Sequence, residues 1–69
     1  MTTLVDARGL SCPQPVILAQ RAIQAGDLPA EVLVDTAAAY ENVSRAAERL
    51  GCRVEVEEME EEFRLTIAR

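Results

Sequence analysis

Residues 52–58 read Cys-Arg-Val-Glu-Val-Glu-Glu and residues 62–68 read Glu-Phe-Arg-Leu-Thr-Ile-Ala, and in both stretches apolar and polar side chains alternate. A period of two is typical of a β-strand that buries one face. Because only residues 59–61 connect them, the two strands are expected to form an antiparallel hairpin. The side chains predicted to face inward are Cys52, Val54, Val56, Phe63, Leu65 and Ile67. The polar outer faces predict a sheet that is open to solvent on one side and covered by helices on the other.

Two helices that could cover this sheet are predicted earlier in the chain. The first runs from Pro13 to about Ala25, and the second covers Ala37–Leu50 with Asp35 or Thr36 as its cap. Both carry apolar residues at the spacing of a single helical face. The predicted inward residues are Pro15, Leu18, Ala19, Ala22 and Ile23 in the first helix, and Ala39, Val43, Ala46, Ala47 and Leu50 in the second.

Short apolar strands are predicted before each helix, at Thr3–Asp6 and Ala30–Asp35. The element order is then βαβαββ. We therefore predict an α+β fold: a single domain over residues 1–69, built as a two-layer α/β sandwich in which two helices cover one face of a four-stranded mixed sheet. If the first two strands are parallel, as right-handed crossovers favour, both helices begin at the same edge of the sheet.

Composition excludes several classes of function. The 69 residues carry a net charge of −5, which argues against nucleic acid as a partner. All seven basic residues are Arg, and the lack of His removes the commonest general base and metal ligand. Two cysteines forty positions apart, with no C-x-x-C pair, predict no metal site and no disulfide framework. No signal peptide and no membrane span is recognisable, so we expect a cytoplasmic protein with reduced thiols.

The run Cys12-Pro13-Gln14-Pro15 places a thiol where the first helix begins. Pro suits the first turn of a helix, because the missing N–H has no helical partner there. The partial positive charge at a helix N-terminus stabilises a thiolate, so the pKa of Cys12 is expected to be below that of a free thiol. With Cys12 at or near the N-cap, Gln14 offers the nearest free amide. The alternative is a small hydrophobic side chain packed under the helix end.

Other residues are expected to share this edge of the sheet with Cys12. They are the loop residues Arg8 and Gly9 and the cap residues Asp35 and Thr36. Arg8 could add positive potential near the thiol, or it could be an ordinary solvated loop charge. Asp6 is interpreted as a turn cap rather than a direct participant.

The stretch Asp6-Ala7-Arg8-Gly9-Leu10-Ser11-Cys12-Pro13-Gln14-Pro15 resembles the signature of the TusA/SirA/YedF sulfur-carrier family, which is marked by Cys-Pro-x-Pro at the start of the first helix. Residues 41–45 and 53–58 look most similar to the N-terminal domain of YedF-like proteins, which are linked to selenium metabolism. The resemblance covers essentially the whole chain. YedF-like proteins usually continue into a DsrE-like second domain, whereas this chain ends at Arg69.

The resemblance implies a persulfide carried on Cys12, supported by Pro13, Gln14 and Pro15. It also implies two protein partners, a sulfur donor similar to a cysteine desulfurase and a downstream acceptor, and no cofactor. We expect a monomer. Two alternatives stay open: a regulatory or interaction module in which Cys12 is a passive cap, and a selenium-handling variant of the same carrier.

Two further positions have a predicted role. Cys52 is in phase with the inward-facing valines of its strand, so we expect a structural thiol; the alternative is a resolving cysteine that forms a disulfide with Cys12. Ile17 lies roughly opposite the inward stripe of the first helix, near Arg21. An exposed apolar residue one turn from the thiol is predicted to be part of a partner-docking surface.

Overall fold

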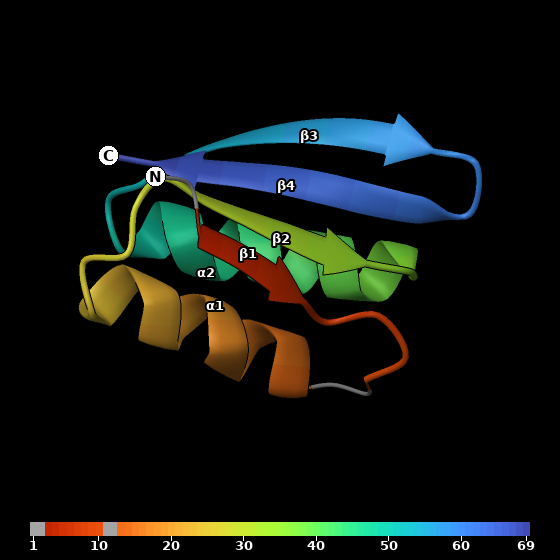
Figure 1. Ribbon diagram of the computed structural model, residues 1–69, viewed down its shortest axis with the longest axis horizontal. Helices are drawn as coiled ribbons and strands as arrows, with labels where there is room; N and C mark the ends of the chain where they lie inside the picture. Colours follow the sequence, from red (N-terminus) through yellow and green to blue (C-terminus); the bar gives the residue numbers. More distant parts are fainter. Residues whose placement is uncertain (1–2, 11–12) are drawn as a thin grey trace.

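Figure 1 shows the computed structural model, in which two helices cover one face of a four-stranded sheet. The structure describes residues 3–10 and 13–69. The two-layer α+β architecture and the βαβαββ order are as predicted. The elements, in chain order, are β1 (Thr3–Asp6), α1 (Gln14–Gln24), β2 (Ala30–Val34), α2 (Ala37–Arg49), β3 (Arg53–Met59) and β4 (Glu62–Ala68).

The strands lie in the order β1-β2-β4-β3. β1 and β2 are parallel, as predicted, with Val5 opposite Val32. β4 pairs antiparallel with both β2 and β3, so the hairpin joins the sheet through its second strand. β2 and β4 therefore occupy the centre, and β1 and β3 are the edges.

The core lies between the central strands and the helices. Along β2, the inward side chains of Ala30, Val32 and Val34 are fully buried, which matches the period of two. Leu65 and Ile67 of β4 extend this apolar layer. The helices contribute mainly small side chains, which let α1 and α2 lie side by side against the sheet (Figure 1). Their buried residues are Pro15, Ala19, Ala22, Ile23, Ala39, Val43, Ala46 and Ala47.

Two residues predicted to face the core are exposed. Leu50 follows the last residue of α2 and is 39% exposed, because the chain turns away at Gly51 and no longer follows the helical stripe. Val56 lies on the predicted face of β3 and is paired with the buried Leu65 of β4, but its side chain is 40% exposed. β3 is an edge strand, so Val56 has a neighbouring strand on one side only.

Candidate functional site

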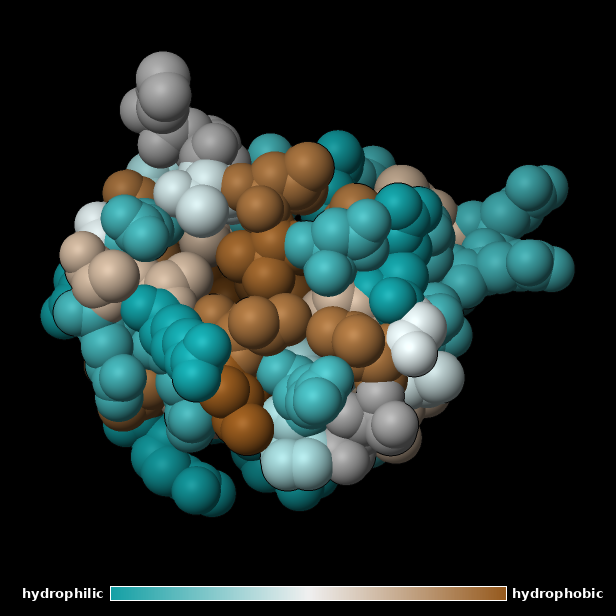
Figure 2. All heavy atoms as spheres, turned by 60° about the horizontal axis from the view of Figure 1, so that its bottom comes forward, coloured by the Kyte–Doolittle hydropathy of each residue, from teal (hydrophilic) through white to brown (hydrophobic). Residues whose placement is uncertain are grey.

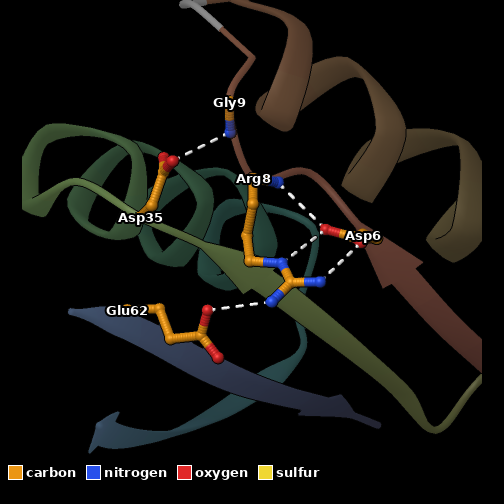
Figure 3. A network of polar contacts seen from close by, with 5 residues as sticks. All are labelled: Asp6, Arg8, Gly9, Asp35 and Glu62. Carbon is orange, nitrogen blue, oxygen red and sulfur yellow. Dashed lines mark hydrogen bonds and ion pairs between the residues drawn. The ribbon is translucent and has the colours of Figure 1, made fainter. Parts of the chain in front are cut away.

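The loop after β1 and the start of α2 lie at the same edge of the sheet, as the parallel pairing of β1 and β2 predicts (Figure 3). A backbone hydrogen bond from Ala7 to Leu33, at 2.9 Å, continues this pairing beyond β1. We call the residues of this edge, Arg8, Gly9, Pro13, Gln14, Asp35 and Thr36, the rim. Cys12, the predicted reactive residue, lies outside the described residues, so its role stays a prediction.

Asp35 ties the two loops of the rim together. Its Oδ2 atom accepts a hydrogen bond from the backbone N–H of Gly9 at 2.9 Å, between residues 26 positions apart (Figure 3). Gly9 has a φ of +77°, which L-residues with a side chain rarely adopt, so glycine fits this position. The predicted neighbourhood of Gly9 and Asp35 is therefore present as a direct contact.

Thr36 caps α2. Its hydroxyl oxygen accepts a hydrogen bond from the N–H of Ala39 at 3.1 Å, as an N-cap side chain does for the third helical residue. Of the two predicted caps, Thr36 has this role, and Asp35 is free to hold the Gly9 loop.

Arg8 lies between two carboxylates on the open side of the sheet. Its guanidinium donates to both oxygens of Asp6, each at 2.9 Å, and to Oε2 of Glu62 on β4 at 3.0 Å. In Figure 3 this side chain crosses the end of β2, pointing away from α1. One positive charge is thus balanced by two negative charges, which leaves little positive potential for the start of α1. The prediction that Arg8 assists the thiol stays untested, and the structure shows a cross-strand link instead.

The same contacts shift the pKa values of both Asp6 and Arg8. The side-chain hydrogen bonds from Arg8, followed by the bond from its backbone N–H at 3.2 Å, lower the pKa of Asp6 to about 2. The carboxylates of Asp6 and Glu62 raise the pKa of Arg8 above its ordinary value. Asp6 accepts the N–H two residues ahead, which is the turn-cap geometry predicted for it.

Glu62 is the part of this network that sequence reasoning missed. In the acidic stretch 57–62, Glu62 pairs with Arg8 and Glu57 pairs with Arg64. Arg8 and Glu62 are 54 positions apart, so no local pattern connects them. Only the placement of β4 beside β2 brings them together.

The first helix begins at Gln14, one residue after the predicted start at Pro13. Pro13 is the N-cap residue of α1, and its carbonyl accepts the first helical hydrogen bond, from Ile17 N–H at 3.0 Å. Pro15 is buried in the first turn and has no N–H to leave unpaired. Gln14 and Val16 carry N–H groups that have no acceptor within the helix. Cys12 thus directly precedes the cap in the chain.

A shallow groove of about 340 Å³ runs along α1 from this end. It is lined by Leu10, Gln14, Ile17, Leu18 and Arg21. Ile17 is 40% exposed, as its predicted position opposite the core requires. Figure 2 shows a continuous hydrophobic area on the molecular face that carries this helix. Both predicted docking residues, Ile17 and Arg21, line this groove.

Cys52 lies away from this groove, in the core. The residue is 6% exposed, its thiol is unbonded, and its N–H donates to the carbonyl of Ala47 at 3.0 Å. This burial is what the predicted structural role requires. Among residues 3–10 and 13–69 there is no group of three or more His, Cys, Asp or Glu side chains that could hold a metal ion.

Residues 3–69 match the family model described as sulfurtransferase TusA. The protein belongs to the TusA family. The match spans all six elements, including the loop and the helix start that form the rim. Membership implies a sulfur-carrier role, and proteins of the TusA family interact with sulfur donor and acceptor proteins.

A solved structure supports the same assignment. The chain is similar to the SirA-like protein from Desulfitobacterium hafniense, with 32% identity and a TM-score of 0.86. The similarity covers 97% of this chain and 95% of that one. No curated protein matches the chain closely enough to be considered a relative. The narrower likeness to YedF-like proteins stays a prediction. No helix in the described part of this TusA-family chain is long and apolar enough to cross a membrane.

Proposed function

We propose that the protein relays persulfide sulfur on Cys12 between a donor protein and an acceptor protein. The observation that carries this proposal is the match to the TusA family across a chain whose Cys-Pro-Gln-Pro run leads directly into α1. The start of a helix offers unpaired N–H groups and partial positive charge, which favour a thiolate over a thiol.

Thiol exchange accounts for the chemistry without an acid–base residue. The Cys12 thiolate attacks the terminal sulfur of a donor persulfide, R–S–SH. A bond forms between Sγ of Cys12 and that sulfur, the donor S–S bond breaks, and the donor leaves as the thiolate R–S⁻. Delivery reverses the roles: an acceptor thiolate takes the terminal sulfur, and Cys12 leaves as the thiolate. Both steps conserve oxidation state, so no external oxidant or reductant is needed.

The rim residues would support this exchange in distinct ways. Pro13 and Pro15 remove donors from the first turn, which leaves Gln14 and Val16 to offer N–H groups near the sulfur. Asp35 holds the loop before Cys12 through Gly9, and Thr36 fixes the start of α2 beside it. These residues are positioning residues in the proposal, while Cys12 is the residue that bonds to sulfur.

Mass spectrometry tests the proposal directly. Purified protein is incubated with cysteine persulfide as a small donor, and we expect an adduct of one sulfur atom on Cys12. Cys12→Ser should abolish the adduct and leave the fold intact, because Ser is well accepted near a helix N-terminus. Cys52→Ala is the matched control and should still accept sulfur. A Cys12 that alkylates no faster than a model thiol across a pH series would remove the physical basis of the proposal.

The groove along α1 is the proposed docking surface for the sulfur partners. Its exposed Ile17 lies one turn beyond Gln14, so a partner covering it would reach the start of the helix. Ile17→Glu should weaken sulfur transfer from a protein donor without changing the loading of Cys12 by cysteine persulfide. Gln24→Glu adds the same charge at the exposed far end of α1 and should leave both reactions unchanged.

A further inference from the structure

Charge is distributed unequally between the two layers. The strands and the hairpin turn carry eight carboxylates, at Asp6, Glu31, Glu55, Glu57, Glu58, Glu60, Glu61 and Glu62. The helices carry two, Glu41 and Glu48. The arginines of the sheet layer are engaged: Arg8 and Arg64 each bridge two carboxylates, and Arg53 donates to the Arg69 carbonyl at 3.4 Å.

The arginines of the helix layer are different. Arg21, Arg45 and Arg49 form no ion pair or hydrogen bond through their side chains with any residue that the structure describes. Glu41 precedes Arg45 by one helical turn, a spacing that commonly gives an ion pair, yet none forms. A chain with a net charge of −5 thus has three helix arginines that form no ion pair with a described residue.

Two of these arginines, Arg45 and Arg49, line the same groove. A groove of about 280 Å³ lies between the helices. It is lined by the cap residue Pro13, by Val16 and Gln20 of α1, and by Asn42, Arg45, Ala46 and Arg49 of α2. On its α1 side the groove runs from Pro13 to Gln20, seven helical steps or about 10 Å, which is the length of about three extended residues. One end is at Pro13, the residue after Cys12, so the groove leads to the proposed sulfur site along the flank of α1 opposite the Ile17 groove.

We propose that this groove binds an acidic segment of a partner protein, with Arg45 and Arg49 receiving its carboxylates. A guanidinium presents a planar fork of donors that fits a carboxylate, and the side chains of Val16 and Ala46 give the groove an apolar part for the peptide backbone. The inference rests on the proposed function, because a carrier must hold its partner close to Cys12.

The acidic sheet layer explains how this groove selects its partner. The eight carboxylates of the sheet layer outnumber its arginines, so this layer repels a negatively charged segment, whereas the helix arginines attract it. Complementary charge thus sets the orientation of docking. Nucleic acid is disfavoured, since a polyanion longer than the groove would meet the acidic surface.

The test uses NMR titration of the intact protein with a capped hexaglutamate peptide at low salt. We expect shifts at the side-chain N–H groups of Arg45 and Arg49 and at the amide of Gln14. Arg45→Gln/Arg49→Gln should weaken peptide binding roughly tenfold or more, because two charge-assisted contacts are lost. Arg53→Gln/Arg69→Gln makes the same change in net charge outside the groove and should leave affinity within about twofold.

Three results would overturn the inference. An equal loss in both double variants would mean that net charge alone controls binding. Equal affinity for a six-nucleotide single strand would assign the groove to anions in general. Self-association that buries Arg45 and Arg49 against the acidic hairpin of a second copy would identify that copy as the occupant.

Loading of Cys12 by cysteine persulfide separates this inference from the proposed function. Peptide binding that depends on Arg45 and Arg49 in a protein whose Cys12 accepts no sulfur would defeat the sulfur-carrier proposal and leave the groove assignment standing. Normal loading with no dependence of peptide binding on these arginines would defeat the groove assignment alone.

Discussion

Replacing Asp35 tests whether one hydrogen bond holds the loop that leads to Cys12. Asp35→Ala removes the acceptor of the Gly9 N–H, which lies at 2.9 Å. It also removes a negative charge next to the N-terminus of α2. Both groups are exposed, so we take about 1 kcal/mol for the hydrogen bond and about 0.5 kcal/mol for the helix dipole, at the low end of their usual ranges.

This loss is large for a domain of this size. A change of 1 kcal/mol in the free energy of unfolding shifts the Tm of a domain of 60–100 residues by roughly 4–8 °C, so Asp35→Ala should lower it by roughly 6–12 °C. Locally, losing about 1 kcal/mol should raise the population of the open loop about fivefold. Asp35→Asn keeps an acceptor oxygen but loses the charge, so we expect about half of the fall in Tm and about half of the free-energy change of loop opening.

Hydrogen exchange followed by NMR measures the local effect at the Gly9 amide, and thermal unfolding measures the global one. The matched control is Asp27→Ala, which removes an exposed loop carboxylate that has no side-chain hydrogen bond to any described residue. An unchanged exchange rate at Gly9 in Asp35→Ala would refute the reasoning. A loss of stability equal to that of the Asp27 variant would do the same.

Three other predictions concern the packing and the loop. Cys52→Ala should lower the free energy of unfolding by about 1 kcal/mol, because it leaves a small cavity in the core. In the folded parent protein, Cys52 should resist alkylating reagents. Labelling as fast as in urea would contradict its burial. The carboxylate of Asp6, with its pKa lowered to about 2 from 3.8, stabilises the fold fully above the higher value and progressively less as pH falls through the lower one. Thermal unfolding between pH 5 and 2 should therefore show a smaller acid-induced loss in Asp6→Asn, whereas parallel curves would argue against the Arg8 link. Gly9→Ala should lower the free energy of unfolding by denaturant by about 1–2 kcal/mol. The loss comes from the φ of +77° alone, since an added Cβ meets no atom within 4 Å. Gly9→Asn should cost less, and an alanine variant as stable as the parent protein would show that the loop relaxes.

Periodicity was sufficient to predict which side of most elements is buried. A strand alternates its side chains and a helix repeats about every 3.6 residues, so the inward positions of β2, β4 and both helices follow from the order of residues. The prediction failed for Leu50 and Val56, where the pattern continues past the surface that the opposite layer covers. The end of a buried face is set by the partner layer, which no local pattern contains.

The sequence by itself determined the element order, the parallel first pair of strands, the helix start after Cys12 and the family to which the chain belongs. Tertiary structure alone decided that β4 rather than β3 lies beside β2. That single choice brings Glu62 to Arg8. The packing of α1 against α2 likewise creates the groove that joins Pro13 to Arg45 and Arg49. The physical reason is range: turns, caps and periodicity act between residues a few positions apart, whereas these contacts join residues 32 to 54 positions apart and form only when both layers pack.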